Sequence, residues 1–213
     1  MGDLDFAALR AAMVDSQLRT SDVTDAGVVA AMAQVARENY VPAGRRASAY
    51  IDRAIPLGNG RAVNPPLATG RLLVAADVRP GDKVLLIGAA GGYTAAVLDA
   101  MGAQVVAIEE TEGLGGEASL PKGVTLVKGP LAKGAAKHAP YDVLLIDGAV
   151  EQLPAALTDQ LAEGGRIACG INDKGVCRVE AGRKIAGHIG LASLYDMEMA
   201  TLPGFAPPPS FQF

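Results

Sequence analysis

The chain has few of the residues that build metal centres and hydrolase active sites. Its 213 residues include two cysteines and two histidines. Cys169 and Cys177 do not have metal-ligand spacing, so we expect no zinc site and interpret Cys169 as a buried strand residue. No nucleophile pattern lies near His138 or His188. A Ser-His-Asp or Cys-His hydrolase is therefore not expected.

Basic charge and long apolar runs are also scarce. The formal net charge is -4 and the isoelectric point is near 5.2, without a basic stripe, which argues against nonspecific nucleic-acid binding. No stretch reaches the roughly 18 consecutive apolar residues of a membrane span. Residues 1–6 are acidic and lack the pattern of a secretory signal. We expect neither a nucleic-acid nor a membrane partner, and a cytoplasmic location.

The length and the apolar content of 50% are those of a chain with a sizeable core. We interpret 1–213 as a single domain, with N-terminal helices and a loop in 1–66 and an α/β sheet with a tail in 67–213. Helical spacing of apolar residues covers 5–18. Asp25 can begin a second helix.

Two long stretches have less regular patterns. Residues 41–66 hold several prolines and glycines and are expected to be irregular. Apolar residues in 185–199 suit one or two late strands at the sheet edge. Residues 203–213 are predicted to form an extended tail that packs its phenylalanines onto the body. The alternative for this tail is a partner-docking segment.

From Leu67 the pattern becomes an alternation of helices and short apolar strands, starting with a helix to about Val78. Such alternation predicts an α/β fold with a doubly wound, mostly parallel sheet that is covered on both faces. The predicted strands are 83–87, 104–109, 124–128, 142–147 and 166–171, and further helices fall near 92–101 and 153–162.

The most informative stretch begins at Lys83. It reads as a strand, a glycine-rich turn, a helix and a second strand that ends in Glu109. Such a turn lets the backbone approach a ligand closely, and an acidic residue about 20 positions later can accept hydrogen bonds from ribose hydroxyls. The pattern therefore predicts a nucleoside site. The alternatives are a turn that only packs strand against helix, and a Glu109 that is a solvated loop charge.

Several separate segments resemble the protein-L-isoaspartate O-methyltransferase family, in order along the chain. This resemblance implies a class I S-adenosylmethionine-dependent methyltransferase with a Rossmann-like sheet. It also implies that the enzyme uses S-adenosylmethionine to methylate isoaspartyl carboxylates in damaged proteins or peptides; it leaves the oligomeric state open. The resembling segments are 14–19, 29–42, 50–58, 63–66, 139–142 and 154–165.

The resemblance also assigns site residues. Asn64 stands where the family places a serine beside the acceptor, and its amide could orient a carboxylate; the alternative is that it caps a local turn. An acceptor carboxylate is ionised near neutral pH, so attack on the methyl group needs positioning rather than a general base. Tyr93 is interpreted as a packing residue as well as a cofactor neighbour. The residues implied for the cofactor are Gly88, Ala89, Ala90, Gly92, Tyr93 and Glu109.

Three positions depart from the family pattern. Leu86 replaces a carboxylate before the turn, Ala90 replaces a glycine, and Pro130 replaces an aspartate that accepts from the adenine amino group. Losing two charge-assisted hydrogen bonds would cost roughly 1.5–3 kcal/mol each. These departures motivate an alternative, a catalytically degenerate relative that serves as a binding or interaction module.

Asp147 suggests a further alternative. It ends an apolar run, and the segment resembles the metal-dependent catechol-type O-methyltransferases, in which such an aspartate holds magnesium. The residue could then belong to a small-molecule O-methyltransferase. The simpler interpretation is that Asp147 caps the following helix or bonds loop backbone, and the preferred assignment contains no metal.

Overall fold

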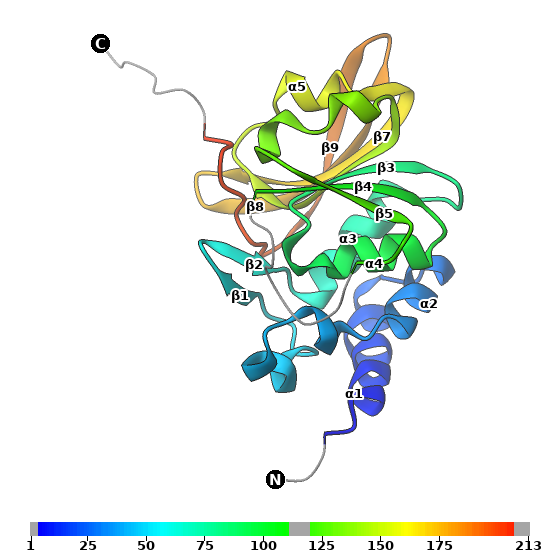
Figure 1. Cartoon of the computed structure of the whole chain (residues 1–213), viewed down its shortest axis with the longest axis vertical. Coiled ribbons are helices and arrows are strands. Elements are labelled where there is room, and N and C mark those ends of the chain that lie inside the picture. Colours follow the sequence, from blue (N-terminus) through cyan, green and yellow to red (C-terminus); the bar gives the residue numbers. More distant parts are fainter. Residues whose placement is uncertain (1–3, 111–119, 207–213) are drawn as a thin grey trace.

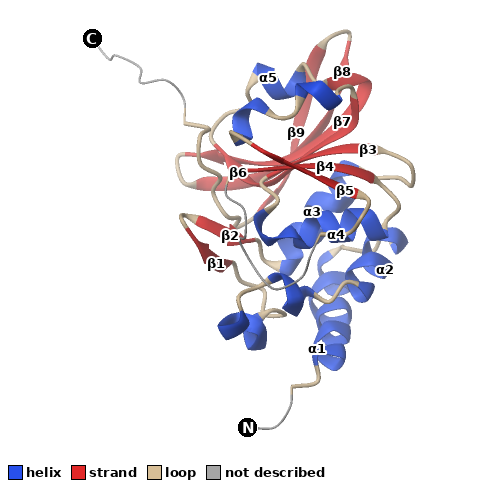
Figure 2. Cartoon of the chain, in the orientation of Figure 1, coloured by secondary structure: helices blue, strands red, loops and turns tan. Residues whose placement is uncertain are grey.

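The computed structural model describes residues 4–110 and 120–206. Its centre is a seven-stranded sheet in the order β5-β4-β3-β6-β7-β8-β9, and a separate two-stranded sheet pairs β1 with β2. Figure 1 shows the N-terminal helices at one end of the molecule and the hairpin of the last two strands at the other. Helices cover both faces of the large sheet (Figure 2). This is the α/β architecture that the sequence predicts.

The elements have the following bounds. The α-helices are α1 (Phe6–Met13), α2 (Ala26–Gln34), α3 (Pro66–Ala76), α4 (Tyr93–Ala100) and α5 (Ala155–Thr158), and a π-helical turn (Val14–Leu18) extends α1. The strands are β1 (Ile55–Gly58), β2 (Arg61–Val63), β3 (Lys83–Ile87), β4 (Gln104–Glu109), β5 (Val124–Lys128), β6 (Tyr141–Val150), β7 (Leu161–Asp173), β8 (Val176–Ile185) and β9 (His188–Asp196).

The first strands are parallel and match the predictions closely. β3 pairs with β4 on one side and with β6 on the other, and β5 continues the sheet. Both faces of β3 are buried, which explains its nearly continuous apolar sequence. Leu86 packs into the core on one face, and its neighbours Leu85 and Ile87 pack into the core on the other. The predicted strands 83–87, 104–109 and 124–128 are confirmed.

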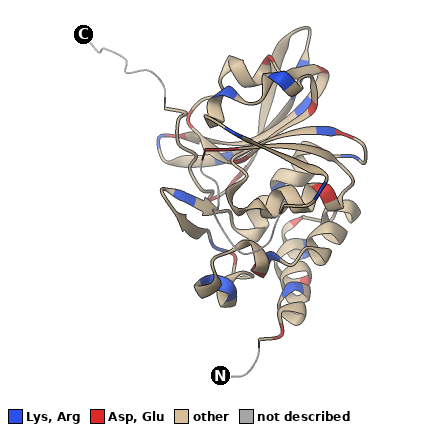
Figure 3. Ribbon diagram, viewed as in Figure 1, with Lys and Arg blue, Asp and Glu red and all other residues tan. Residues whose placement is uncertain are grey.

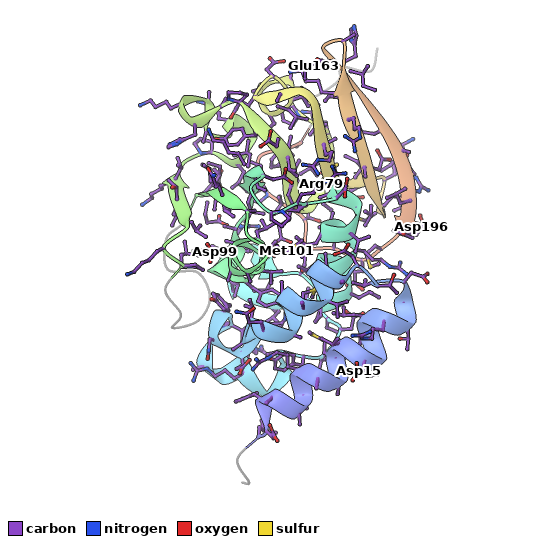
Figure 4. The ribbon with its side chains drawn as sticks, turned by 90° about the vertical axis from the view of Figure 1, so that its right-hand side faces the viewer. Asp15, Arg79, Asp99, Met101, Glu163 and Asp196 are labelled. Atoms are coloured by element: carbon purple, nitrogen blue, oxygen red, sulfur yellow. The ribbon has the colours of Figure 1, made fainter. Side chains whose placement is uncertain are left out.

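The antiparallel edge is also confirmed. β7, β8 and β9 form a meander, so the expected late strands are present at the edge of the sheet. Glu163 accepts hydrogen bonds from the backbone amides of Ala186 and Gly187 at the turn between β8 and β9, near the end of the molecule where Figure 4 labels it. Cys169 is fully buried in β7, as expected.

Three predictions of local structure are wrong. The helix expected at 153–162 is limited to α5, because Leu161 already pairs with Tyr141 of β6. The segment 41–66 is not irregular throughout, since it contains the β1–β2 hairpin. Asp147 does not end its strand, because β6 continues to Val150 through an irregular register.

A returning chain covers the carboxyl ends of the strands. After β9, the C-terminal segment, defined here as residues 197–206, runs back between the sheet and the β1–β2 hairpin (red in Figure 1). The amide of Ala149 donates to the carbonyl of Ala200, and the amide of Leu202 donates to the carbonyl of Ala149, both at 2.8 Å. Phe205 is buried, as the tail prediction requires. Phe211 and Phe213 lie outside the described residues.

Charges of both signs are spread over the ribbon. Figure 3 shows blue and red positions on the helical end, the sheet and the connecting loops. Within residues 4–110 and 120–206, no helix combines the length and apolarity that crossing a membrane requires.

Candidate cofactor and acceptor site

The glycine turn and Glu109 lie next to each other because of the sheet register. Ile87 is the last residue of β3 and is paired with Ile108 of β4, so the turn and Glu109 follow at adjacent carboxyl ends. Gly88 and Gly92 have φ angles of 79° and 92°, in the left-handed region that favours glycine. Parallel sheets bind ligands at this edge. The structure therefore brings together the two parts of the predicted nucleoside site.

Glu109 is buried and its carboxylate is fully engaged. The Arg61 guanidinium donates to it through Nη2 at 2.7 Å and Nε at 3.3 Å. The amides of Ala90 and Glu110 donate to it at 3.0 and 2.9 Å. The side chains of Arg61 and Glu109 are only 2% and 6% exposed. Glu109 is thus not a solvated loop charge, and the alternative based on that idea is wrong.

Two side chains stand directly in front of Gly88. A β-carbon built on Gly88 would lie 3.0 Å from the Leu202 methyl carbons and 3.1 Å from Nη2 of Arg61. At Gly92 the equivalent position would be 2.5 Å from a methyl carbon of Leu120. The residue types fit a nucleoside cofactor, since a glycine turn faces a carboxylate at a strand end. The space beside Gly88, however, is filled by the chain's own Arg61 and Leu202.

Asn64 joins three distant segments. Its Nδ2 donates to Oδ1 of Asp147 at 2.7 Å, and its Oδ1 accepts from the amide of Ala200 at 2.8 Å. Its backbone carbonyl accepts from Nη2 of Arg37. Both side-chain hydrogen bonds of this buried residue go to distant segments, so the alternative in which Asn64 caps a local turn is wrong. One of its two amide protons is committed to Asp147.

Asp147 is a buried carboxyl at the same edge. Burial raises its pKa, against the opposing effects of the Thr94 and Asn64 side chains and of the nearby charges of Arg61 and Arg37. Asp147 does not cap the following helix, because α5 begins after Pro154 without a side-chain cap; its carboxylate accepts from the Asn64 side chain instead. Within the described parts of the chain, no three His, Cys, Asp or Glu residues are grouped to hold a metal ion.

Arg37 is a buried neighbour of the site that the sequence did not predict. It is fully buried, donates from Nε to the carbonyl of Ala49 at 2.7 Å, and lies 4.7 Å above the ring of Tyr93. Burial lowers the pKa of Arg37 and raises the pKa of Tyr93 to about 12. Tyr93 also packs edge-to-face against Tyr40, at 6.0 Å between ring centroids. Tyr93 therefore has the packing role that was expected.

Arg61 and Leu202 were missed as well. Arg61 meets Glu109 across 48 positions of sequence, so no local pattern reveals the pair. Arginine is rarely buried unless it is paired, and only the burial of Glu109 could have indicated that a cation was needed.

The three positions that depart from the family pattern have plain structural settings. Leu86 and Ala90 are buried, and Pro130 precedes a short 3₁₀ helix (Leu131–Lys133).

Comparisons of the sequence with known proteins show the family to which the chain belongs. The profile of the family described as "Protein-L-isoaspartate(D-aspartate) O-methyltransferase (PCMT)" matches residues 9–199. A protein-L-isoaspartate O-methyltransferase of Koribacter versatilis (strain Ellin345) is 37% identical over 205 residues, which cover 93% of this chain and 92% of that relative. One from Methylorubrum populi is 39% identical over 173 residues, covering 79% of this chain and 82% of the relative.

Solved structures show the same fold. A protein-L-isoaspartate O-methyltransferase superimposes with a TM-score of 0.77 and 21% identity, over 92% of this chain and 66% of that one. A Plasmodium falciparum structure described as a putative enzyme of this type, in complex with S-adenosyl-L-homocysteine, gives a TM-score of 0.73 and 19% identity. The superposition covers 94% of this chain and 99% of that one.

Proposed function

Because the chain belongs to the protein-L-isoaspartate(D-aspartate) O-methyltransferase family, we propose that it transfers the methyl group of S-adenosylmethionine to the carboxylate of isoaspartyl residues in proteins or peptides. The cofactor is S-adenosylmethionine. The observation that carries the proposal at the site is the register of β3 and β4, which sets the glycine turn beside Glu109. An isoaspartyl-containing protein is the expected partner.

The cofactor side is assigned to the glycine turn and the strand end. In this proposal the backbone from Gly88 to Gly92, including Ala89 and Ala90, receives the cofactor, and Glu109 accepts from its ribose hydroxyls. Tyr93 begins α4 directly after the turn and is held by its contacts with Tyr40 and Arg37. The bound cofactor supplies an electrophilic methyl group.

The acceptor side is assigned to Asn64. An acceptor carboxylate carries its negative charge at neutral pH, so the protein has to position it rather than deprotonate it. The Nδ2 proton that Asp147 does not use can donate to one carboxylate oxygen and leave the other free to attack. The hydrogen bonds of Asn64 to Asp147 and Ala200 would hold the amide in one orientation for this purpose.

Family membership over most of the chain favours this activity over the two alternatives, a degenerate binding module and a small-molecule O-methyltransferase.

We further propose that residues 1–213 act as a single domain, since the β1–β2 hairpin and the C-terminal segment both bond across the site. Both cysteines are free, which supports the proposed cytoplasmic location.

The direct test is methyl transfer from labelled S-adenosylmethionine to a synthetic isoaspartyl peptide. The same peptide with a normal aspartyl residue is the control. Base-labile methyl ester should form on the isoaspartyl peptide alone. If neither peptide is labelled while the protein binds S-adenosylhomocysteine, the acceptor assignment fails. Methylation of both peptides would show that the site does not select the isoaspartyl linkage.

A further inference from the structure

Glu109 has no acceptor position left for a ribose in this structure. A carboxylate offers about four acceptor sites, and Glu109 accepts four hydrogen bonds from Arg61, Ala90 and Glu110. Ribose contributes two hydroxyl donors, so two of these bonds have to be given up. The donors in Ala90 and Glu110 are backbone amides, one in the glycine turn and one in the peptide next to Glu109, so they are fixed beside the carboxylate. The two that can be released are those from Arg61.

Arg61 comes from an element that is separate from the large sheet. β2 has three residues and pairs with β1 only. Asn59 and Gly60 at the hairpin turn both have positive φ angles, of 50° and 72°. The guanidinium is also incompletely satisfied: its buried Nη1 has no hydrogen-bond partner among the described residues. Because β2 pairs with β1 only, movement of Arg61 breaks no hydrogen bond between strands of the central sheet.

Arg61 also occupies the space beside Gly88 that the cofactor would need. Its Nη2 and the methyl carbons of Leu202 both lie about as close as atoms can to a β-carbon position on Gly88. Glycine at this position provides room for a close approach, and that room is taken by these two side chains. The hydrogen bonds to Glu109 and the filled space beside Gly88 therefore both indicate that Arg61 has to move before the cofactor binds.

We propose that Arg61 is a gating residue that competes with the cofactor ribose for Glu109. The guanidinium has to leave Glu109, with Leu202 moving aside, before Glu109 can hold the ribose. The apparent affinity for the cofactor is then reduced by the fraction of molecules in which the Arg61–Glu109 pair is open. This inference rests on the proposed function, because it takes the ribose of S-adenosylmethionine as the ligand of Glu109.

The test is calorimetric titration of S-adenosylhomocysteine into the native protein and into Arg61→Gln. Glutamine removes the cation and the two-pronged contact but remains polar. If the open state is about one tenth populated in the native protein, the variant should bind about tenfold more tightly. The matched control is Arg166→Gln, which removes another mostly buried ion pair, with Asp82 at 2.6 Å. Arg166→Gln should leave the affinity unchanged.

A double variant establishes whether the effect passes through Glu109. In the Glu109→Gln background there is no ion pair to open, so adding Arg61→Gln should produce no further gain in affinity. A gain of the same size in both backgrounds would overturn the proposal. Should Arg61→Gln not fold, Arg61→Lys decides: a lysine cannot reproduce the two-pronged contact, so tighter binding than native is expected.

The outcomes separate the gate from the function. Native binding together with equal or weaker binding by Arg61→Gln would overturn the gate and leave the proposed function intact. Weaker binding would identify Arg61 as a direct cofactor contact. Absence of binding up to millimolar concentration in the native protein and in every Arg61 variant would overturn both proposals.

Discussion

The Nδ2 atom of Asn64 donates a 2.7 Å hydrogen bond to Oδ1 of Asp147, although 83 positions separate the two residues. Both side chains are buried. The bond ties the segment after the β1–β2 hairpin to β6, and the second bond of Asn64, to the amide of Ala200, adds the C-terminal segment. One amide thus sets the relative positions of three elements around the candidate site.

Replacing Asn64 with alanine should destabilise the fold. The change leaves the Asp147 carboxyl and the Ala200 amide without these partners, at a cost of about 2–4 kcal/mol in the free energy of unfolding. Urea denaturation followed by circular dichroism measures this loss. Gln152→Ala removes an exposed hydrogen bond to the Ala206 carbonyl and is the control, with an expected change within about 0.5 kcal/mol. Equal losses in the two variants would contradict the structural role of Asn64.

Asp147 should make stability fall as the pH rises. Its pKa is raised by burial in the folded state, so the folded protein holds the proton more tightly than the unfolded chain does. The favourable contribution is complete below the unfolded pKa, near 3.9, and is lost as the pH rises through the raised folded value. Asp147→Asn keeps an acceptor for Asn64 without a buried charge, and it should gain on the order of 1 kcal/mol at pH 8.

This prediction is checked by unfolding native protein and Asp147→Asn at a series of pH values. The difference in unfolding free energy should be smallest at the lowest pH tested, where the native carboxyl is protonated, and should increase as the pH rises through the raised folded pKa. A difference that is independent of pH would show that the folded and unfolded pKa values of Asp147 are alike.

Gly92→Ala should be more damaging than an ordinary glycine replacement. Gly92 has a φ of 92°, and a new β-carbon would meet Leu120 at 2.5 Å. Backbone strain alone costs roughly 1–2 kcal/mol, and the contact adds to it. Gly44 is the control, because it lies outside the left-handed region and has no atoms within 4 Å of its β-carbon position. Gly44→Ala should be neutral or slightly stabilising, and equal melting temperatures for the two variants would refute the expectation.

Arg37→Lys should not behave as a conservative change. The guanidinium donates to the carbonyls of Ala49 and Asn64 and stacks on Tyr93, whereas an ammonium group cannot keep this planar arrangement. We expect a loss of about 2 kcal/mol in denaturant unfolding. Arg19→Lys is the matched control, since Arg19 pairs with Asp15 on the surface at 3.4 Å. Similar effects at the two positions would argue against a special role for Arg37.

Much of the fold could be predicted because its signals are local. The apolar run of β3, the glycine turn and the strand that ends in Glu109 are contiguous, and their order implies parallel pairing. Register then places Gly88 and Glu109 together with no further information. The exception near α5 follows from a tertiary contact, since pairing of Leu161 with Tyr141 extends β7 at the expense of the helix.

The site was only half predictable from the sequence. The composition of the turn and the carboxylate at a strand end predict a nucleoside site because backbone geometry demands those residue types. The partners of Glu109, Asn64 and Asp147 come from segments far away in the chain, and hydrogen bonds of this kind leave no periodic pattern.

The sequence by itself therefore determined the strands and their parallel order, and it predicted a ligand class for the turn, because backbone conformation and apolar periodicity act over a few residues. Only the tertiary structure decided that Arg61 fills acceptor positions of the Glu109 carboxylate and that Asn64 donates a hydrogen bond to Asp147. The physical reason is burial. A carboxylate removed from water has to find compensating donors, and which donors reach it depends on how the hairpin and the C-terminal segment pack over the sheet.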